Sequence, residues 1–128
     1  MKTLPLTFQN LQTANRERSN AVWPQCNEWD LNDWMLALVG EVGELINEIK
    51  HLKLIQTDSN FIGLSAKIDQ QRQIDDTKLK ARRELADIII YADLFAQALD
   101  VELAAVIIEK FNHTSQKVGS DIRLTYGA

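Results

Sequence analysis

Two acid-x-x-acid pairs, each inside a long segment of helix-periodic apolar residues, constrain the fold of this chain more than any other feature. The first pair is Glu41 and Glu44, and the second is Glu84 and Asp87. Residues three apart lie on the same face of an α-helix. Two such helices packed side by side would gather four carboxylates, which repel one another and are costly to bury. We therefore expect a bound cation. Ligand sets made of oxygen alone suit Mg²⁺ above all, and Mn²⁺ could substitute for it.

Glycine and proline are scarce in this chain, with five and two residues among 128. Because these residue types break helices and form turns, their scarcity favours long helices joined by few turns. We predict an all-α fold, an antiparallel bundle of about four main helices. Those helices are expected over residues 7–20, 31–54, 77–99 and 101–117. Residues 55–76 carry no clear pattern, and we predict a turn at 57–60 followed by a short helix or a lid.

The expected helix ends carry residues that suit helix caps. Thr7 is a candidate N-cap for the first helix, and Asp30 or Asn32 could cap the second. Their side-chain oxygens can accept hydrogen bonds from the first free backbone N–H groups of a helix. Asp100 is the predicted N-cap of the fourth helix, and Gly119 is predicted to end it.

Apolar residues recur at helical spacing along the second and third predicted helices. In the second helix they are predicted to form one stripe, made of Leu31, Trp34, Met35, Leu38, Val42, Leu45, Ile49 and Leu52. In the third helix the core stripe comprises Leu85, Ile88, Ile89, Ala92, Phe95, Ala96 and Leu99. Ile90 and Leu94 add apolar surface on the opposite flank of that helix. A helix that is apolar on several sides is usually buried in a bundle or at a subunit interface. We therefore expect an oligomer, either a homodimer or a homotetramer.

Acidic residues border these stripes. At about 100° per residue, Glu41, Glu44 and Glu48 lie together along one edge of the second helix. Glu48 is therefore a further candidate metal ligand. On the third helix, Tyr91 follows the second acidic pair along the corresponding edge. It is either a core aromatic residue with its hydroxyl at the edge or a contact for a ligand.

Length and charge narrow the remaining possibilities. At 128 residues the chain is expected to form one domain over 1–128. The net charge is −4, and without the four motif carboxylates the remaining 14 acids balance 14 bases. The chain therefore lacks the excess of basic residues that is typical of nucleic-acid-binding proteins.

No apolar run approaches the ~18 residues of a membrane span, and no signal-peptide segment is evident. Cys26 is the single cysteine, which suits a reducing compartment. We expect a cytoplasmic protein whose partners include neither nucleic acid nor membrane.

Two segments resemble a known family. Residues 36–45, LALVGEVGEL, and residues 84–91, ELADIIIY, resemble the signature helices of MazG-like proteins. These belong to the all-α nucleoside triphosphate pyrophosphohydrolases, which include the dCTP pyrophosphatases. The resemblance covers residues 30–54 and 80–118. Within the second stretch, Lys110-Phe111-Asn112 and the residues after it resemble the family's nucleotide-contacting segment.

The resemblance implies hydrolysis of a nucleoside triphosphate between its α and β phosphates, giving a monophosphate and pyrophosphate in nucleotide-pool house-cleaning. It implies that Glu41, Glu44, Glu84 and Asp87 form the catalytic Mg²⁺ site. Either Glu44 or Glu48 could orient the attacking water. Candidate substrate contacts are Lys110 and Asn112 at the phosphates, Tyr91 at the site's edge, and Trp23 or Trp29 stacked on the base.

Two departures from the family leave the base preference open. The segment between the motifs, residues 45–83, is long, so contacts of a lid or of the base do not transfer. In addition, His51 stands where dCTP pyrophosphatases carry an aromatic residue.

Two other classes of protein share part of this pattern. A di-iron carboxylate bundle needs Glu-x-x-His pairs, whereas this chain has Glu44 and Asp87 at the third position. A non-catalytic helical module that binds nucleotides or another partner is the remaining alternative. A resemblance in sequence indicates which residues bind a ligand, but it does not indicate whether the ligand is turned over.

Overall fold

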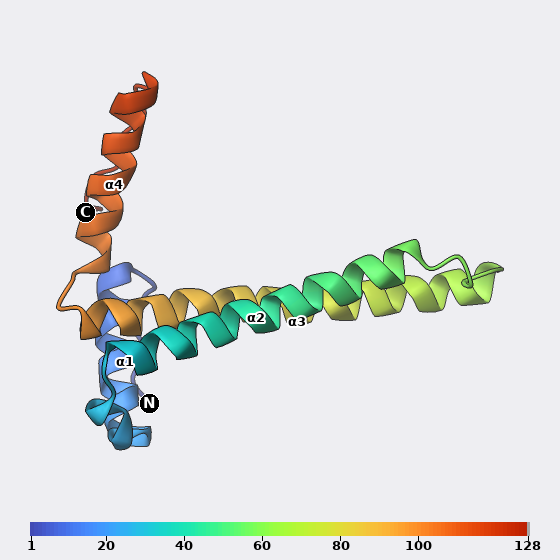
Figure 1. The fold of residues 1–128 in the computed structure, drawn as a ribbon, viewed down its shortest axis with the longest axis horizontal. Helices are drawn as coiled ribbons and strands as arrows, with labels where there is room; N and C mark the ends of the chain where they lie inside the picture. The colour runs from blue at the N-terminus through green and yellow to red at the C-terminus, as the bar shows by residue number, and fades with distance from the viewer. Residues whose placement is uncertain (128) are drawn as a thin grey trace. The chain divides into compact units, whose positions relative to one another are not determined.

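The computed structural model describes residues 1–127, and within that range helices are its only regular secondary structure (Figure 1). It contains four α-helices and one short 3₁₀-helix. They are α1 (Phe8–Val22), η1 (Pro24–Glu28), α2 (Leu31–Thr57), α3 (Leu64–Ala98) and α4 (Leu103–Val118). The all-α prediction with four main helices is confirmed. None of the described helices is long and apolar enough to cross a membrane.

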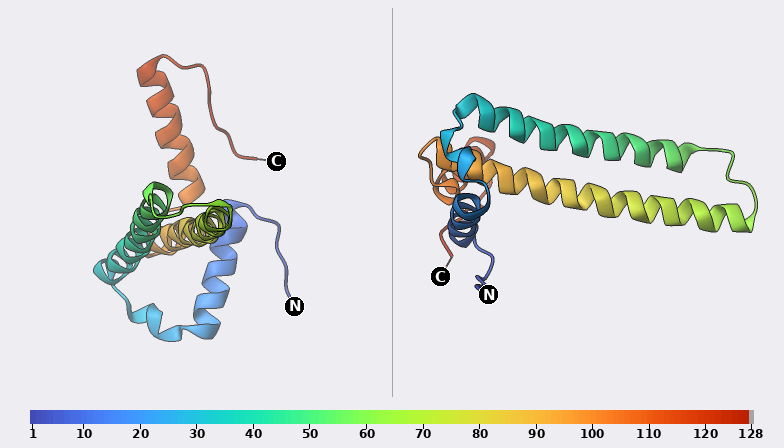
Figure 2. Two further views of the ribbon diagram at one scale, coloured as in Figure 1. Left: turned by 90° about the vertical axis from the view of Figure 1, so that its right-hand side faces the viewer. Right: turned by 90° about the horizontal axis from the view of Figure 1, so that it is seen from below.

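The chain forms two compact units, one made of residues 1–34 and 92–127 and the other of residues 35–91. The second unit is a helical hairpin, in which α2 and α3 run antiparallel, side by side (Figures 1 and 2). The inward row of α2 alternates steps of three and four residues and is buried or half-buried: Leu38, Glu41, Leu45, Glu48, Leu52 and Ile55. On α3 the corresponding row includes Gln70, Thr77, Ala81, Glu84 and Ile88.

The third helix begins at Leu64, and not at residue 77 as predicted from the sequence. Residues 64–76 are therefore part of a 35-residue helix and form no separate lid. Side-chain pairs four residues apart stabilise the polar stretch: Gln71 donates to Asp75 and Gln73 to Asp69, at 2.9 and 3.1 Å. The sequence looked irregular there because residues 64–76 are largely exposed and carry no continuous apolar stripe.

One apolar stripe predicted for α2 is two rows in the structure. Leu38, Leu45 and Leu52 belong to the half-buried inward row. Met35, Val39, Val42, Ile46 and Ile49 form a second row, and all five are exposed, with Val39 at 56% and Ile46 at 53%. On α3, Leu85 and Ile89 are exposed as well. Leu31 and Leu99, at the ends of the predicted stripes, are exposed too. The core prediction is therefore wrong, in the single chain, for Leu31, Met35, Val42, Ile49, Leu85, Ile89 and Leu99.

The unit made of residues 1–34 and 92–127 has a polar centre. Asp93 is only 1% exposed and accepts hydrogen bonds from Asn15 Nδ2 at 2.9 Å and Gln97 Nε2 at 2.8 Å. Gln97 also donates to the backbone carbonyl of Gln12 at 3.2 Å. Because a buried carboxylate is costly without such donors, this network holds α1 against the last turns of α3.

Three of the four predicted caps are confirmed. Thr7 Oγ1 accepts from the backbone N–H of Asn10 at 2.9 Å. Asp30 caps α2 and exchanges hydrogen bonds with Asp33, at 2.9 and 3.0 Å. Gly119 ends α4 in the left-handed conformation, with φ of 73°.

The fourth cap prediction is wrong. Asp100 has φ of 56° and closes α3, because its N–H bonds to Gln97 O and the following N–H, of Val101, bonds to Ala96 O. Glu102 precedes α4 and makes no side-chain capping bond.

Candidate metal centre

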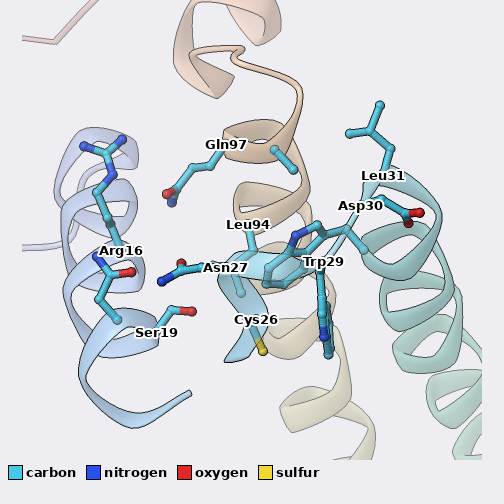
Figure 3. A pocket seen from close by; sticks show the side chains of 12 residues that line it. Arg16, Ser19, Cys26, Asn27, Trp29, Asp30, Leu31, Leu94 and Gln97 are labelled. Carbon is cyan, nitrogen blue, oxygen red and sulfur yellow. The ribbon is translucent and has the colours of Figure 1, made fainter. Parts of the chain in front are cut away.

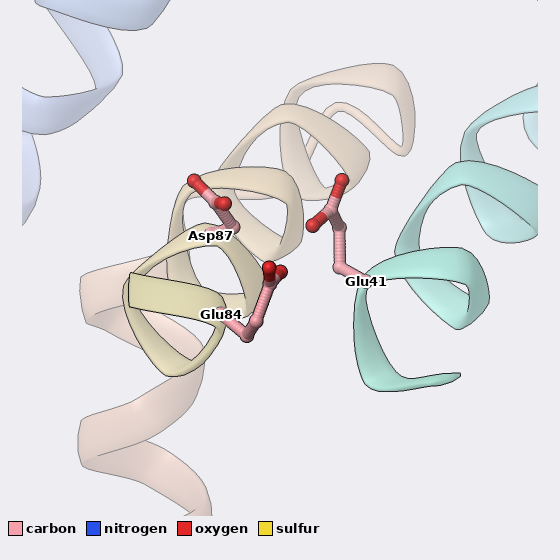
Figure 4. A group of neighbouring side chains, drawn as sticks. All are labelled: Glu41, Glu84 and Asp87. Carbon is pink, nitrogen blue, oxygen red and sulfur yellow. The ribbon is translucent and has the colours of Figure 1, made fainter. Parts of the chain in front are cut away.

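Three carboxylates from the two helices of the hairpin converge at one point (Figure 4). Glu41 is contributed by α2, and Glu84 and Asp87 by α3. One oxygen from each lies within 4.8 Å of the other two, and all three residues are half-buried. The inward row of α2 brings Glu41 to α3, and the three-residue spacing of Glu84 and Asp87 places both on the facing side. The structure thus brings the two sequence motifs together.

Glu44 lies at the exposed margin of this cluster and interacts with it. A hydrogen bond with Glu44 is the largest cause that raises the pKa of Glu84, to about 7. Partial burial and the negative charges of Glu44, Asp87 and Glu41 raise the pKa of Glu84 further. All four predicted ligands are therefore electrostatically linked.

The pKa of Glu41 is also raised, chiefly by burial and then by the charges of Glu44 and Asp87. Burial and the charges of neighbouring carboxylates contribute to both shifts. Negative charges crowded at a partly desolvated place favour the protonated, neutral forms of the carboxyl groups. A divalent cation would reverse this preference, because it stabilises the charged forms.

Glu41 and Glu84 each have one oxygen, Oε2, that is shielded from solvent and has no hydrogen-bond partner among the described residues. Buried polar atoms are normally paired, and unpaired ones are costly. A hard cation fits this arrangement, because the donors are all carboxylate oxygens and because the two unpaired atoms belong to opposite helices. Glu41, Glu84 and Asp87 could hold such an ion, with Glu44 beside them.

Two further residues predicted for the site lie on the same helices as the acidic cluster and close to it in the sequence. Glu48 lies in the inward row of α2 and is half-buried, but it is not among the three converging carboxylates. Tyr91 is half-buried on α3, one helical turn beyond Asp87.

The unit containing α1 holds a pocket of about 560 Å³ (Figure 3). Trp29 lines it and meets Trp34 edge to face, with ring centroids 4.7 Å apart. Polar groups from α1, η1 and α3 share the lining, among them Arg16, Asn27 and Gln97. Trp23 is not part of the lining, and the guanidinium of Arg18 lies over its ring, 5.9 Å from the centroid.

The two predicted phosphate contacts on α4 differ in their surroundings. Lys110 is exposed. Asn112 is half-buried, and its carboxamide is engaged by the backbone of Leu124: Nδ2 donates to Leu124 O at 2.9 Å, and Oδ1 accepts from Leu124 N at 2.8 Å.

The polar residues of the pocket and the Asp93 network were not predicted from the sequence. A signal was present, because Asp93 and Gln97 interrupt an otherwise apolar run four residues apart. Polar residues on an apolar helix face need partners when they are buried.

Comparison with known proteins assigns no family to the chain: no protein-family model matches it, and no curated protein is significantly similar to it.

Proposed function

We propose that this protein is a Mg²⁺-dependent nucleoside triphosphate pyrophosphohydrolase that converts a nucleoside or deoxynucleoside triphosphate to the monophosphate and pyrophosphate. The observation that carries the proposal is the convergence of Glu41, Glu84 and Asp87 from two antiparallel helices, within 4.8 Å. The resemblance of these two helices to the signature helices of MazG-like proteins supplies the reaction class.

The cluster's chemistry supports magnesium. Its donors are oxygen atoms only, with no histidine among the four acidic motif positions, which disfavours iron and zinc. Glu41, Glu84 and Asp87 would hold the ion, and Mg²⁺ would neutralise phosphate charge and polarise the scissile phosphorus–oxygen bond. Mn²⁺ would be a substitute.

The exposed member of the cluster has a separate task. Glu44 orients the attacking water and accepts its proton, since it lies at the solvent margin and is not one of the three converging ligands. Glu48 is the alternative for this role, although it lies farther along the inward row of α2.

The nucleotide contacts are proposed from the resemblance and from the pocket. Trp29 offers a flat apolar surface in a pocket rimmed by amide and guanidinium groups, which suits a nucleobase. Trp23 is the alternative stacking residue. Lys110 and Asn112 contact the phosphates, and Tyr91 borders the site. We further propose a cytoplasmic role in removing unwanted nucleotides.

A second copy of the chain covers the exposed row of α2. Val39, Val42, Ile46 and Ile49 each follow an inward residue by one position, which turns them about 100° away from α3, and Met35 continues this row toward the start of α2. Leu85 and Ile89 are related in the same way to Glu84 and Ile88. Because the helices run antiparallel, the same rotation brings both rows to one side of the hairpin. The alternating three- and four-residue spacing of the α2 row is that of helix–helix packing in bundles.

A screen of the eight standard NTPs and dNTPs tests the function. The purified protein is incubated with each nucleotide and Mg²⁺, and pyrophosphate and orthophosphate are measured separately. Pyrophosphate with an equimolar monophosphate is expected for at least one nucleotide. Release of orthophosphate and a diphosphate would reject the reaction. Tight nucleotide binding with no turnover would favour a non-catalytic binding module.

An active-site variant and a matched control complete the screen. Asp87→Asn removes a converging carboxylate and is expected to abolish turnover. Asp76→Asn makes the same change at an exposed position of the same helix and is expected to leave turnover unchanged. Equal loss in both variants would indicate a general effect of charge and would count against the site.

A further inference from the structure

Gln97 lines the pocket of the unit made of residues 1–34 and 92–127, and its carboxamide is held there in one orientation (Figure 3). The nitrogen Nε2 donates to Asp93 Oδ2 at 2.8 Å and to the backbone oxygen of Gln12 at 3.2 Å. A carboxamide nitrogen carries two hydrogens, so both are committed. Because a backbone carbonyl can only accept a hydrogen bond, the carboxamide cannot turn over without setting two acceptor oxygens against each other.

The oxygen of the same carboxamide, Oε1, is left for the pocket. It accepts no hydrogen bond from residues 1–127, and it is not among the side-chain oxygens that are shielded from solvent. A carboxamide in an open pocket ordinarily offers a ligand both a donor and an acceptor. Gln97 offers an acceptor alone, because the buried network around Asp93 uses both of its N–H groups.

A side chain that can only donate lies on the side of the pocket toward which Gln97 reaches. Figure 3 shows Gln97 extending from α3 toward α1, which carries Arg16. The guanidinium of Arg16 has no acceptor atom, and it forms no salt bridge with a described residue. The pocket therefore combines a fixed acceptor, a free donor and the flat indole ring of Trp29.

We propose that Gln97 and Arg16 make this pocket selective for nucleobases that carry an amino group beside an unprotonated ring nitrogen, the edge that cytosine and adenine share. This inference rests on the proposed function, which places a base against Trp29. The amino group donates to Gln97 Oε1, and the ring nitrogen accepts from Arg16. Uracil, thymine and hypoxanthine present the reverse pattern, in which a carbonyl oxygen lies beside a ring N–H.

A base of the reverse pattern cannot be accommodated by a turn of the carboxamide. Its carbonyl oxygen meets Gln97 Oε1, acceptor against acceptor, and both atoms lose the hydrogen bonds that they make in water. Asp93 is 1% exposed and acts here as a positioning residue, since it holds Gln97 without touching the ligand. Because an unpaired polar group in a binding site is costly, we expect roughly 10- to 100-fold weaker binding of the wrong base.

The test measures the binding of free nucleosides without Mg²⁺, so that neither turnover nor the metal centre enters. Cytidine is compared with uridine, and adenosine with inosine. Each pair has the same ring system and sugar and differs only at the edge in question. Dissociation constants are obtained by NMR titration of the Trp29 indole N–H, which also places the ligand in the pocket. In the wild-type protein cytidine and adenosine should bind roughly tenfold or more tightly than their partners.

Two variants and a matched control examine the source of this preference. Gln97→Met removes the carboxamide and keeps a side chain of similar length, so that the preference within each pair should disappear. Asp93→Ala removes one of the two acceptors that fix Gln97, and the preference should decrease. A loss of stability alone would weaken both members of a pair alike and leave their ratio unchanged. Gln9→Met makes the same change as Gln97→Met at an exposed position of α1 outside the pocket, and it should leave the preference intact.

The wild-type comparison decides the point even where a variant fails to fold. Equal affinities within each pair, or tighter binding of uridine and inosine, would overturn the inference, as would an unchanged preference in Gln97→Met. Pyrophosphate release in the nucleotide screen would in that case leave the proposed reaction standing. If the preference is found but no triphosphate is hydrolysed, the reaction alone has failed. Binding of no nucleoside at millimolar concentration would overturn the inference and remove Trp29 from the proposed nucleotide contacts.

Discussion

Glu41 and Glu84 face each other from antiparallel helices, and each holds one carboxylate oxygen that is shielded from solvent and has no hydrogen-bond partner among residues 1–127. The pKa of each group is raised, and that of Glu84 reaches about 7. A hairpin whose only task was stability would gain from apolar residues at these two positions, because an uncompensated acidic pair opposes the packing. The pair is suited to a cation, which would compensate both charges.

Mg²⁺ should stabilise the folded protein. An ion that binds only the native state raises the free energy of unfolding by mass action, by about 2.7 kcal/mol at ~100 times its dissociation constant. Thermal unfolding with Mg²⁺ and with EDTA measures this shift, and Glu84→Gln should reduce it. If melting temperatures were the same under both conditions, the cluster would not be a metal site.

Neutral isosteres in the cluster should lower turnover while they stabilise the metal-free protein. Glu41→Gln, Glu44→Gln, Glu84→Gln and Asp87→Asn each remove one negative charge and keep the side-chain volume. We expect turnover to fall roughly 100-fold in each, the scale for losing a preorganised electrostatic group. Unfolding without metal should shift to higher temperature because repulsion is relieved. Full activity in all four variants would exclude the site.

Glu48→Gln serves as the graded comparison for these variants. Glu48 is in the inward row but outside the converging group, so its effect on turnover should be smaller than that of Glu41→Gln. A loss as large as that of Glu41→Gln would make Glu48 a full member of the centre.

Stability of the metal-free protein should fall as pH rises from 5 to 8, as far as Glu84 determines it. Its pKa is about 7 in the folded chain, against about 4.5 for an ordinary glutamate side chain. Between these two values the folded state binds more protons than the unfolded state, so each rise in pH favours unfolding. About one unit above pH 7 Glu84 is almost fully charged in the folded chain, and the penalty is then complete. Chemical unfolding in EDTA at several pH values measures the slope, and Glu84→Gln should flatten it.

Magnesium affinity should show the opposite dependence. Because the ion binds the deprotonated cluster, its affinity should increase with pH up to about 7 and protons should be released on binding. Calorimetry in buffers of different ionisation enthalpy detects that release. A pH-independent affinity between pH 5 and 8 would contradict the raised pKa.

The exposed row of α2 should hold two copies together. Ile46→Lys places a charge in the centre of that row and should convert an oligomer into a monomer. Leu54→Lys, at an exposed position of α2 outside the row, is the matched control and should leave the assembly intact. Light scattering reports the mass of each variant. A monomeric wild-type protein at micromolar concentration would show that the row has another purpose.

Much of the local structure follows from the sequence because it depends on neighbours within one helix. The spacing of apolar residues predicts the helices, and the caps at Thr7, Asp30 and Gly119 follow from side-chain chemistry and glycine's tolerance of positive φ. The three-residue spacing within each acidic pair is also local. The start of α3 is the exception, because an exposed polar helix leaves no apolar periodicity to detect.

The faces of the helices were decided by tertiary structure. Val42 and Glu41 are adjacent in the sequence and about 100° apart on α2, and the position of α3 determines that Glu41 turns inward while Val42 stays exposed. The same holds for Glu44, at the margin of the cluster. A periodic pattern defines which residues share a face, but it does not say which face meets a partner helix.

Hydrogen bonds between residues distant in the sequence could likewise not be predicted from any local pattern. Asp93 finds Asn15, and Asn112 finds Leu124. Their hydrogen bonds exist only once separate segments of the chain have been brought together, and the energy of such contacts depends on burial and distance, which a linear sequence does not specify. The sequence alone determined which residues could bind a cation, and the packing of α2 against α3 decided that Glu41, Glu84 and Asp87 converge.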